Sequence, residues 1–89
     1  MLEEERKQID AIDAQLIPLL EKRWDLIIQV ANQKRAHNIP VFDARREQAI
    51  LEKVAEKVSN PDYKESLQDL YSHLFDLSRA YQTKLLDQD

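Results

Sequence analysis

The sequence predicts an all-α chain of three helices, the first of them very long, and two observations carry this prediction. Apolar residues recur at alternating steps of three and four over three separate stretches, which is the spacing of one helix face. The chain also contains no glycine, which is typical of helices joined by very few loops. Its composition of 43% hydrophobic and 34% charged residues predicts one folded domain over residues 1–89.

The first predicted helix extends from Leu2 to His37. Its apolar stripe follows an acidic opening turn and comprises Ile9, Ile12, Leu16, Leu19, Leu26 and Val30. Pro18 lies inside this stretch, where its ring removes one backbone hydrogen bond and crowds the carbonyl of Ala14. Because the apolar pattern continues on both sides of Pro18, we expect the helix to kink there and not to break.

The length of this helix predicts a homodimer. About 35 helical residues extend roughly 50 Å, whereas a compact domain of this size is about 30 Å across. The helix must therefore overhang any globular monomer. From Leu16 to Ala31 its apolar residues also spread beyond one stripe, which indicates contact from more than one side. A second copy of the chain is the simplest cover for that surface.

Two shorter helices are expected to follow. Pro40 ends the first helix, and Asp43 is the expected N-cap of the second. Asn60 is expected to cap the third helix, with Pro61 as its first residue. The inner face of the second helix carries Ile50, Leu51, Val54 and Val58. The inner face of the third carries Tyr63, Leu67, Leu70, Leu74, Leu77, Tyr81 and Leu85.

Composition excludes several classes of function. A net charge of −4 argues against a nucleic-acid-binding protein, since phosphate neutralisation needs a basic face. The chain has no cysteine, so it has no disulfide or thiolate metal site. His73 shares an outer face with Asp69 and Asp76, which we interpret as a solvated surface and not as a metal site. With neither a signal-type apolar run nor a membrane-length segment, we expect a soluble, cytoplasmic protein that binds no membrane.

Six polar residues lie on or beside the predicted inner faces, namely Arg23, Lys34, Arg46, Glu47, Ser78 and Gln82. Arg23 falls within the first apolar stripe, and Lys34 lies within about 20° of it around the helix and about 16 Å along the axis. Ser78 and Gln82 stand one turn apart at the edge of the third stripe. Taken singly, such residues are more often solvated. Together they predict an interhelical pocket with excess positive charge, suited to a small anion with more than one carboxylate.

At this point the sequence resembles the all-helical chorismate mutase family. The matching positions are Arg6, Ile9–Asp10, Ile12–Asp13, Leu16, Leu19–Leu20, Arg23, Val30, Lys34, Pro40–Val41, Asp43, Arg46–Glu47, Ser78 and Gln82. They cover nearly the whole chain, and the spacing from Arg23 through Lys34 to the Asp43–Glu47 segment is the specific part of the match. Pro18 and the Trp24–Asp25 pair depart from the family pattern.

The resemblance implies an intertwined helical homodimer of three-helix chains with two active sites. The implied reaction converts chorismate to prephenate in aromatic amino-acid biosynthesis, toward phenylalanine and tyrosine, without a cofactor. Carboxylate contacts are implied for Arg6, Arg23, Arg46 and Ser78. Hydrogen bonds to the breaking ether oxygen are implied for Lys34 and Gln82, and contacts to the ring hydroxyl for Glu47 and the backbone at Asp43.

The position of Arg6 gives a geometric consequence of this resemblance. Arg6 precedes Arg23 by seventeen residues, which is about 25 Å along a helix. One small substrate cannot contact both side chains in the same chain. If Arg6 contacts substrate, it serves the pocket of a partner chain.

Two alternatives remain open from the sequence alone. An isochorismate-pyruvate lyase resembles the same fold and cationic pocket, although Glu47 favours the mutase because it fits a hydroxyl at the chorismate position. A non-catalytic helical dimerisation module would explain the apolar repeats and the overhang. It would not explain cations and amides on the inner faces, since buried charge weakens a plain coiled coil.

Overall fold

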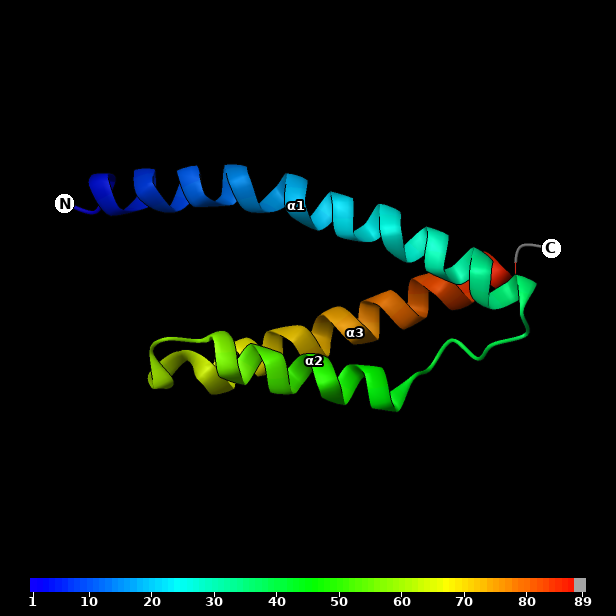
Figure 1. Cartoon of the computed structure of the whole chain (residues 1–89). Coiled ribbons are helices and arrows are strands. Elements are labelled where there is room, and N and C mark those ends of the chain that lie inside the picture. Colours follow the sequence, from blue (N-terminus) through cyan, green and yellow to red (C-terminus); the bar gives the residue numbers. More distant parts are fainter. Residues whose placement is uncertain (88–89) are drawn as a thin grey trace.

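The computed structural model describes residues 1–87 as three α-helices and one short 3₁₀-helix, in the order α1 (Glu3–Ala36), α2 (Ala44–Lys57), η1 (Pro61–Tyr63) and α3 (Lys64–Leu86) (Figure 1). The described residues contain no strand, so the predicted all-α class and the three helices are confirmed. None of the helices in this range is both long and apolar enough to cross a membrane.

The first helix is as long as the sequence predicts. α1 contains 34 residues and continues through Pro18 without a break, and its axis arches along its length (Figure 1). The chain measures 53 Å along its longest axis, with a radius of gyration of 16.1 Å. A compact domain of this length would have a radius near 12 Å. The predicted overhang of α1 is therefore confirmed.

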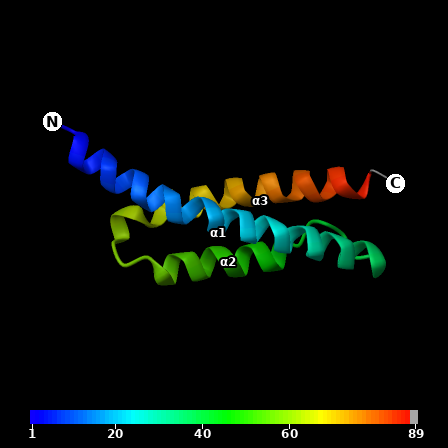
Figure 2. The same ribbon diagram turned by 90° about the horizontal axis from the view of Figure 1, so that it is seen from above.

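α3 is the element that holds the chain together. α2 and α3 run side by side as an antiparallel pair, and α1 crosses over them as a second layer (Figure 2). The C-terminal half of α1 packs on α3, where the rings of Trp24 and Tyr81 meet edge to face at 6.2 Å. Arg35 Nη2 donates to the carbonyls of Leu85 and Leu86 at the C-terminal end of α3.

The faces that the chain buries differ from the predicted stripe of α1 and in part from that of α3, whereas the predicted inner-face residues of α2 are all half-buried. The stripe of α1 is exposed throughout, with Ile12 at 61%, and Leu77 on the predicted stripe of α3 is 56% exposed. The residues of α1 that are buried or half-buried recur on a neighbouring face, and Ala31 is fully buried there. Within one chain α1 contacts only α3, so only a narrow face of α1 is buried, and the cover of its stripe by a second copy stays a prediction.

The connections between helices follow the local sequence. Asn38 adopts φ 56°, a left-handed conformation that asparagine tolerates better than most residues, and it lies two residues after the end of α1 at Ala36. The Asp43 side chain accepts a hydrogen bond from the backbone N–H of Arg46 at 3.0 Å, which confirms Asp43 as the N-cap of α2. Asn60 also caps as predicted, but the turn that begins at Pro61 is 3₁₀ and α3 starts at Lys64. The predicted start of the third helix is corrected accordingly.

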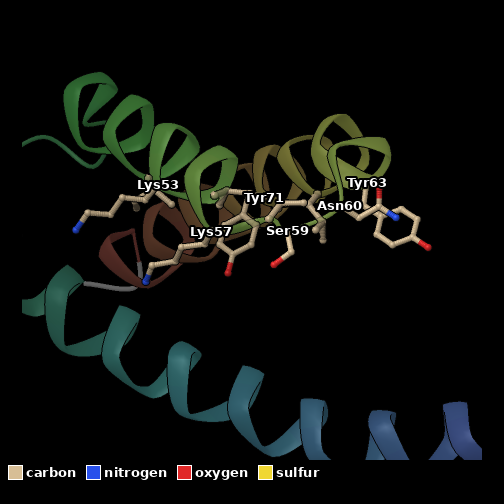
Figure 3. Close-up of a pocket in the computed structure, with 10 residues that line it drawn as sticks. Lys53, Lys57, Ser59, Asn60, Tyr63 and Tyr71 are labelled. Carbon is tan, nitrogen blue, oxygen red and sulfur yellow. The ribbon is translucent and has the colours of Figure 1, made fainter.

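A groove of about 600 Å³ lies on the side of α2 and α3 that faces the N-terminal half of α1. Its apolar walls include Ile50, Val54, Val58 and Leu67. In Figure 3 the labelled side chains of Lys57 and Tyr71 point from α2 and α3 toward the side on which α1 lies. The groove and the exposed stripe of α1 thus form two unpaired apolar surfaces at the same end of the molecule.

Candidate active site

A cavity of about 120 Å³ lies where α1, α2 and α3 converge. Seven of the eight residues predicted for the site line it, and Arg6 does not. The walls are Arg23, Val30 and Lys34 from α1, Val41 and Asp43 from the connection, Arg46, Glu47 and Ile50 from α2, and Phe75, Ser78, Arg79 and Gln82 from α3. Residues from all three helices therefore line one cavity, as expected for the predicted interhelical pocket.

The cavity is positively charged in a negatively charged chain. Four basic side chains and two acidic ones line it, whereas the whole chain carries a net charge of −4. A concave surface with low-dielectric walls concentrates the field of such charges and attracts ligands of opposite sign. The predicted preference for a small anion is consistent with this distribution.

α1 contributes two cations with different surroundings. Lys34 Nζ donates to the carbonyl of Val41 at 2.6 Å, which holds its ammonium at the cavity and leaves two N–H donors for a ligand. Arg23 is half-buried, and its Nη1 is buried with no partner among the described residues. An unpaired buried guanidinium nitrogen costs free energy unless a ligand accepts from it.

α3 contributes an amide and a hydroxyl from the centre of its buried face. Ser78 and Gln82 are buried, with Gln82 only 5% exposed, whereas the sequence placed both at the edge of an apolar stripe. Gln82 Nε2 donates to Ser78 Oγ at 3.0 Å, and Gln82 Oε1 is buried without a partner in the described range. A half-turn about the Cγ–Cδ bond exchanges the two ends of the amide with little change in shape. Ser78 then donates to Oε1, and Nε2–H faces the cavity.

α2 presents its first turn to the cavity. The cap formed by Asp43 fixes where α2 begins, so Arg46 and Glu47 fall on the first turn beside the connection. Arg46 is exposed at the cavity rim, and Glu47 is half-buried. The carboxylate of Glu47 lies 3.4 Å from Arg79 Nη1, an ion pair that joins α2 to α3.

Arg79 is the cavity residue that sequence reasoning missed. It precedes Gln82 by three residues, so the two side chains are neighbours on the surface of α3. That spacing was the available signal, but arginine at the edge of a helix stripe is usually solvated. The ion-pair partner of Glu47 is Arg79 and not Arg46, which is its neighbour in sequence.

Arg6 lies on the exposed first turns of α1 and is absent from the cavity walls. The cavity adjoins a wider hollow of about 580 Å³, with which it shares Val30, Lys34 and Asp43. This hollow is lined by the C-terminal part of α1 and by the connection that follows it. The site is therefore walled by three helices but open on one side.

The arrangement suits binding and electrostatic stabilisation. Arginine and lysine side chains can hold carboxylates through charge-assisted hydrogen bonds. The one hydroxyl on the cavity walls, that of Ser78, is bonded to Gln82, with no histidine beside it to act as a base. The described residues therefore favour a reaction that depends on orienting the substrate and on electrostatic stabilisation of its transition state, and not one that depends on a nucleophile.

Comparison with known proteins gives a consistent result. The family model described as chorismate mutase type II matches residues 5–83. The chain is 39% identical over 51 residues to the T-protein of Haemophilus influenzae, covering 57% of this chain and 14% of that protein. It is also 39% identical over 49 residues to a bifunctional chorismate mutase/prephenate dehydratase of Buchnera aphidicola, covering 55% of this chain and 13% of that protein. No solved structure matches the chain with significance.

Proposed function

The chain belongs to the chorismate mutase type II family, and we propose that it converts chorismate to prephenate in the cavity between its three helices, as a step toward phenylalanine and tyrosine. One observation supports this proposal: Arg23 Nη1 and Gln82 Oε1 are buried without partners among residues 1–87, and both side chains line the same cavity. Buried polar groups are nearly always paired, so a polar ligand is the natural partner. Chorismate offers two carboxylates, an ether oxygen and a hydroxyl.

The proposed reaction needs no nucleophile. The ether C–O bond breaks while a C–C bond forms within one molecule, and no atom or proton enters or leaves. Arg23 binds a substrate carboxylate, and Arg46 and Ser78 complete the carboxylate contacts. Holding the substrate in its chair-like reactive shape removes an entropic barrier before the chemical step.

Negative charge develops on the ether oxygen as its bond to the ring breaks. Lys34, held by the Val41 carbonyl, has two N–H donors left to meet that charge. Gln82 supplies a further donor once its amide is turned so that Ser78 donates to Oε1. Because the charge grows only in the transition state, these donors stabilise it more than the bound substrate.

The ring hydroxyl is the remaining polar group of the substrate. We assign it to Glu47, which is half-buried on the cavity wall, and to the backbone at Asp43. A carboxylate accepts a hydrogen bond from a hydroxyl strongly, and it repels the substrate carboxylates. Glu47 thereby fixes which end of the substrate lies against α2.

The proposed enzyme is an intertwined homodimer, and Arg6 completes the site of the partner chain. Three features of the single chain support this: the exposed stripe of α1, the groove of about 600 Å³ between α2 and α3, and the open side of the cavity. Arg6 lies about 25 Å along α1 from Arg23. A second copy packed into the groove and against α1 covers these surfaces and brings the partner's Arg6 to the open side.

Chorismate turnover by the purified chain is the direct test, and we place this activity in the cytoplasm, where such small-molecule biosynthesis takes place. The absorbance of chorismate is expected to fall and prephenate to form in equal amount. A separate assay with isochorismate and pyruvate detection distinguishes the lyase. Loss of chorismate no faster than in buffer would reject the proposal.

A further inference from the structure

Arg79 lines the cavity, and three contacts hold its guanidinium. Its Nη1 lies 3.4 Å from Glu47 Oε1 on α2, and its Nη2 pairs with Asp76 on its own helix. The face of the guanidinium lies over the ring of Phe42, 4.9 Å from the centroid. A guanidinium is a planar, rigid fork, so contacts from three sides fix both its position and its plane.

The pair with Glu47 is more than a surface ion pair. The side chains of Arg79 and Glu47 are 30% and 21% exposed, whereas Asp76 is 63% exposed. Partial burial reduces the solvent screening that makes exposed pairs weak. The contact to Glu47 therefore contributes more to local order than the contact to Asp76.

Glu47 depends on this contact for its orientation. In the described part of the chain, Arg79 is the only residue that pairs with the Glu47 carboxylate. The glutamate side chain has three rotatable bonds, and the first turn of α2 alone does not fix them. Because Arg79 engages Oε1, the other oxygen, Oε2, remains available as an acceptor.

Arg79 and Arg23 differ in the way that separates a positioning residue from a ligand. Arg79 faces two carboxylates of its own chain, so its charge is already compensated. Arg23 has a buried Nη1 without a partner among residues 1–87. A substrate carboxylate therefore gains more from Arg23 than from Arg79.

We propose that Arg79 is a positioning residue, which holds the Glu47 carboxylate so that its free oxygen accepts the hydrogen bond of the substrate's ring hydroxyl. This inference rests on the proposed function and adds to it a residue that acts through Glu47. Misorientation of Glu47 weakens both the binding and the correct placement of the ring.

A double-mutant cycle tests the inference. Arg79→Met removes the charge and keeps an apolar stem over Phe42, and Glu47→Gln removes the carboxylate that Arg79 is proposed to hold. In the wild-type background Arg79→Met is expected to lower kcat/KM for chorismate roughly tenfold. This is the loss expected when the charge-assisted hydrogen bond between the ring hydroxyl and Glu47 is no longer well formed. In the Glu47→Gln background the same change is expected to cost less than about twofold, because effects of coupled residues are not additive.

Two further variants separate positioning from packing. Arg79→Lys keeps the charge and is expected to recover most of the loss, whereas Arg79→Leu, which also removes the charge, serves for the cycle if Arg79→Met does not fold. Asp76→Asn breaks the other ion pair and is expected to change kcat/KM less than twofold. Equal losses from Arg79→Met in both backgrounds, or no loss in either, would overturn the inference while an active wild type still supported the proposed function. A wild type without chorismate turnover would overturn both.

Discussion

The two halves of α1 carry apolar residues at the same spacing but lie in opposite surroundings. From Leu20 to Ala36 the helix packs along α3, buries Ala31 completely and supplies Arg23 and Lys34 to the cavity. From Glu3 to Leu19 every residue is exposed. Since both halves belong to one continuous helix, local helix propensity cannot explain the difference.

The contrast separates what one chain completes from what it leaves open. At one end, α1, α2 and α3 converge and form a cationic cavity with buried polar atoms that have no partner within the described residues. At the other end, the stripe of α1 and the groove of α2 and α3 face open space, although both have the composition of a buried interface. The exposed half of α1 carries Arg6, so we infer that the open end of one copy completes the cavity of the other.

The strongest test of that inference removes one arginine from each half. Arg23→Ala and Arg6→Ala are each expected to lower kcat/KM by about a hundredfold or more, because each leaves a substrate carboxylate without its charged partner. An equal mixture refolded together is expected to recover about a quarter of the wild-type activity. Half of its dimers are heterodimers, and each of these has one site with both arginines.

A matched control distinguishes shared sites from nonspecific recovery on mixing. Arg23 and Lys34 line the same cavity of one chain, so a heterodimer of Arg23→Ala with Lys34→Ala carries one lesion in each site. That mixture is expected to stay as inactive as its parents. If the Arg6 and Arg23 mixture stays equally inactive, Arg6 does not act between chains.

The second test breaks the open end while sparing the cavity. Ile12→Asp places a charge on the exposed stripe of α1, and burying that side chain in a dimer is worth about 1.5–3 kcal/mol per chain. We therefore expect the dimerisation constant to fall by at least about a hundredfold in sedimentation equilibrium.

Ala14→Asp is the control for this change, because Ala14 lies about 160° around α1 from Ile12. It is expected to alter dimerisation by less than about threefold. If both variants dissociate the protein equally, general destabilisation of α1 is the cause and the stripe has no special role.

The sequence predicted the helices well because their signals are local. The three-four spacing of apolar residues predicted the three helices, and the side chains of Asp43 and Asn60 form caps at the positions that the sequence predicted. The direction in which a stripe faces is not a local property. Periodicity indicates that Ile12 and Leu77 pack against something, but it does not say whether the partner belongs to the same chain, and here both are exposed.

The sequence predicted most of the polar residues that line the cavity, but not how deeply each is buried or which residues pair with one another. Arg23 and Lys34 stood out because charge on an apolar stripe is costly, and both line the cavity. Ser78 and Gln82 gave a weaker signal and yet occupy the most buried face of α3. Arg79 gave almost none, because its place depends on Phe42 and Glu47, which are distant in sequence.

A third test concerns the donor that the cavity requires. In Gln82→Glu the new side chain has nearly the same shape but donates only when protonated. Burial and the substrate's negative charge raise the pKa of this carboxyl, whereas Lys34 lowers it, and we expect the pKa to lie above the free value of about 4.3. Activity is therefore expected to be present at acid pH and to fall as pH rises through that pKa, to roughly a hundredfold below wild type at neutral pH.

The wild type serves as the reference for this profile, since glutamine does not titrate. Steady-state turnover of both proteins is compared from acid to neutral pH, with circular dichroism to confirm that the variant stays folded. Parallel profiles would mean that Gln82 is not the donor and would leave the ether oxygen to Lys34.

The smallest expected effect lies at the open end, at the turn between α2 and α3. Asn60 Oδ1 accepts from the backbone N–H of Asp62 at 2.9 Å, and Asn60 is absent from the cavity walls. Asn60→Ala is expected to cost about 1 kcal/mol of folding free energy and to lower Tm by roughly 4–8 °C, because it removes a cap. Asn60→Asp keeps an acceptor and is expected to change Tm by less than half of that.

Well below the melting temperature, kcat/KM of both Asn60 variants is expected to equal that of the wild type. A clear kinetic defect in Asn60→Ala would show that the turn between α2 and α3 affects the shape of the cavity. The open end would then contribute to catalysis as well as to stability.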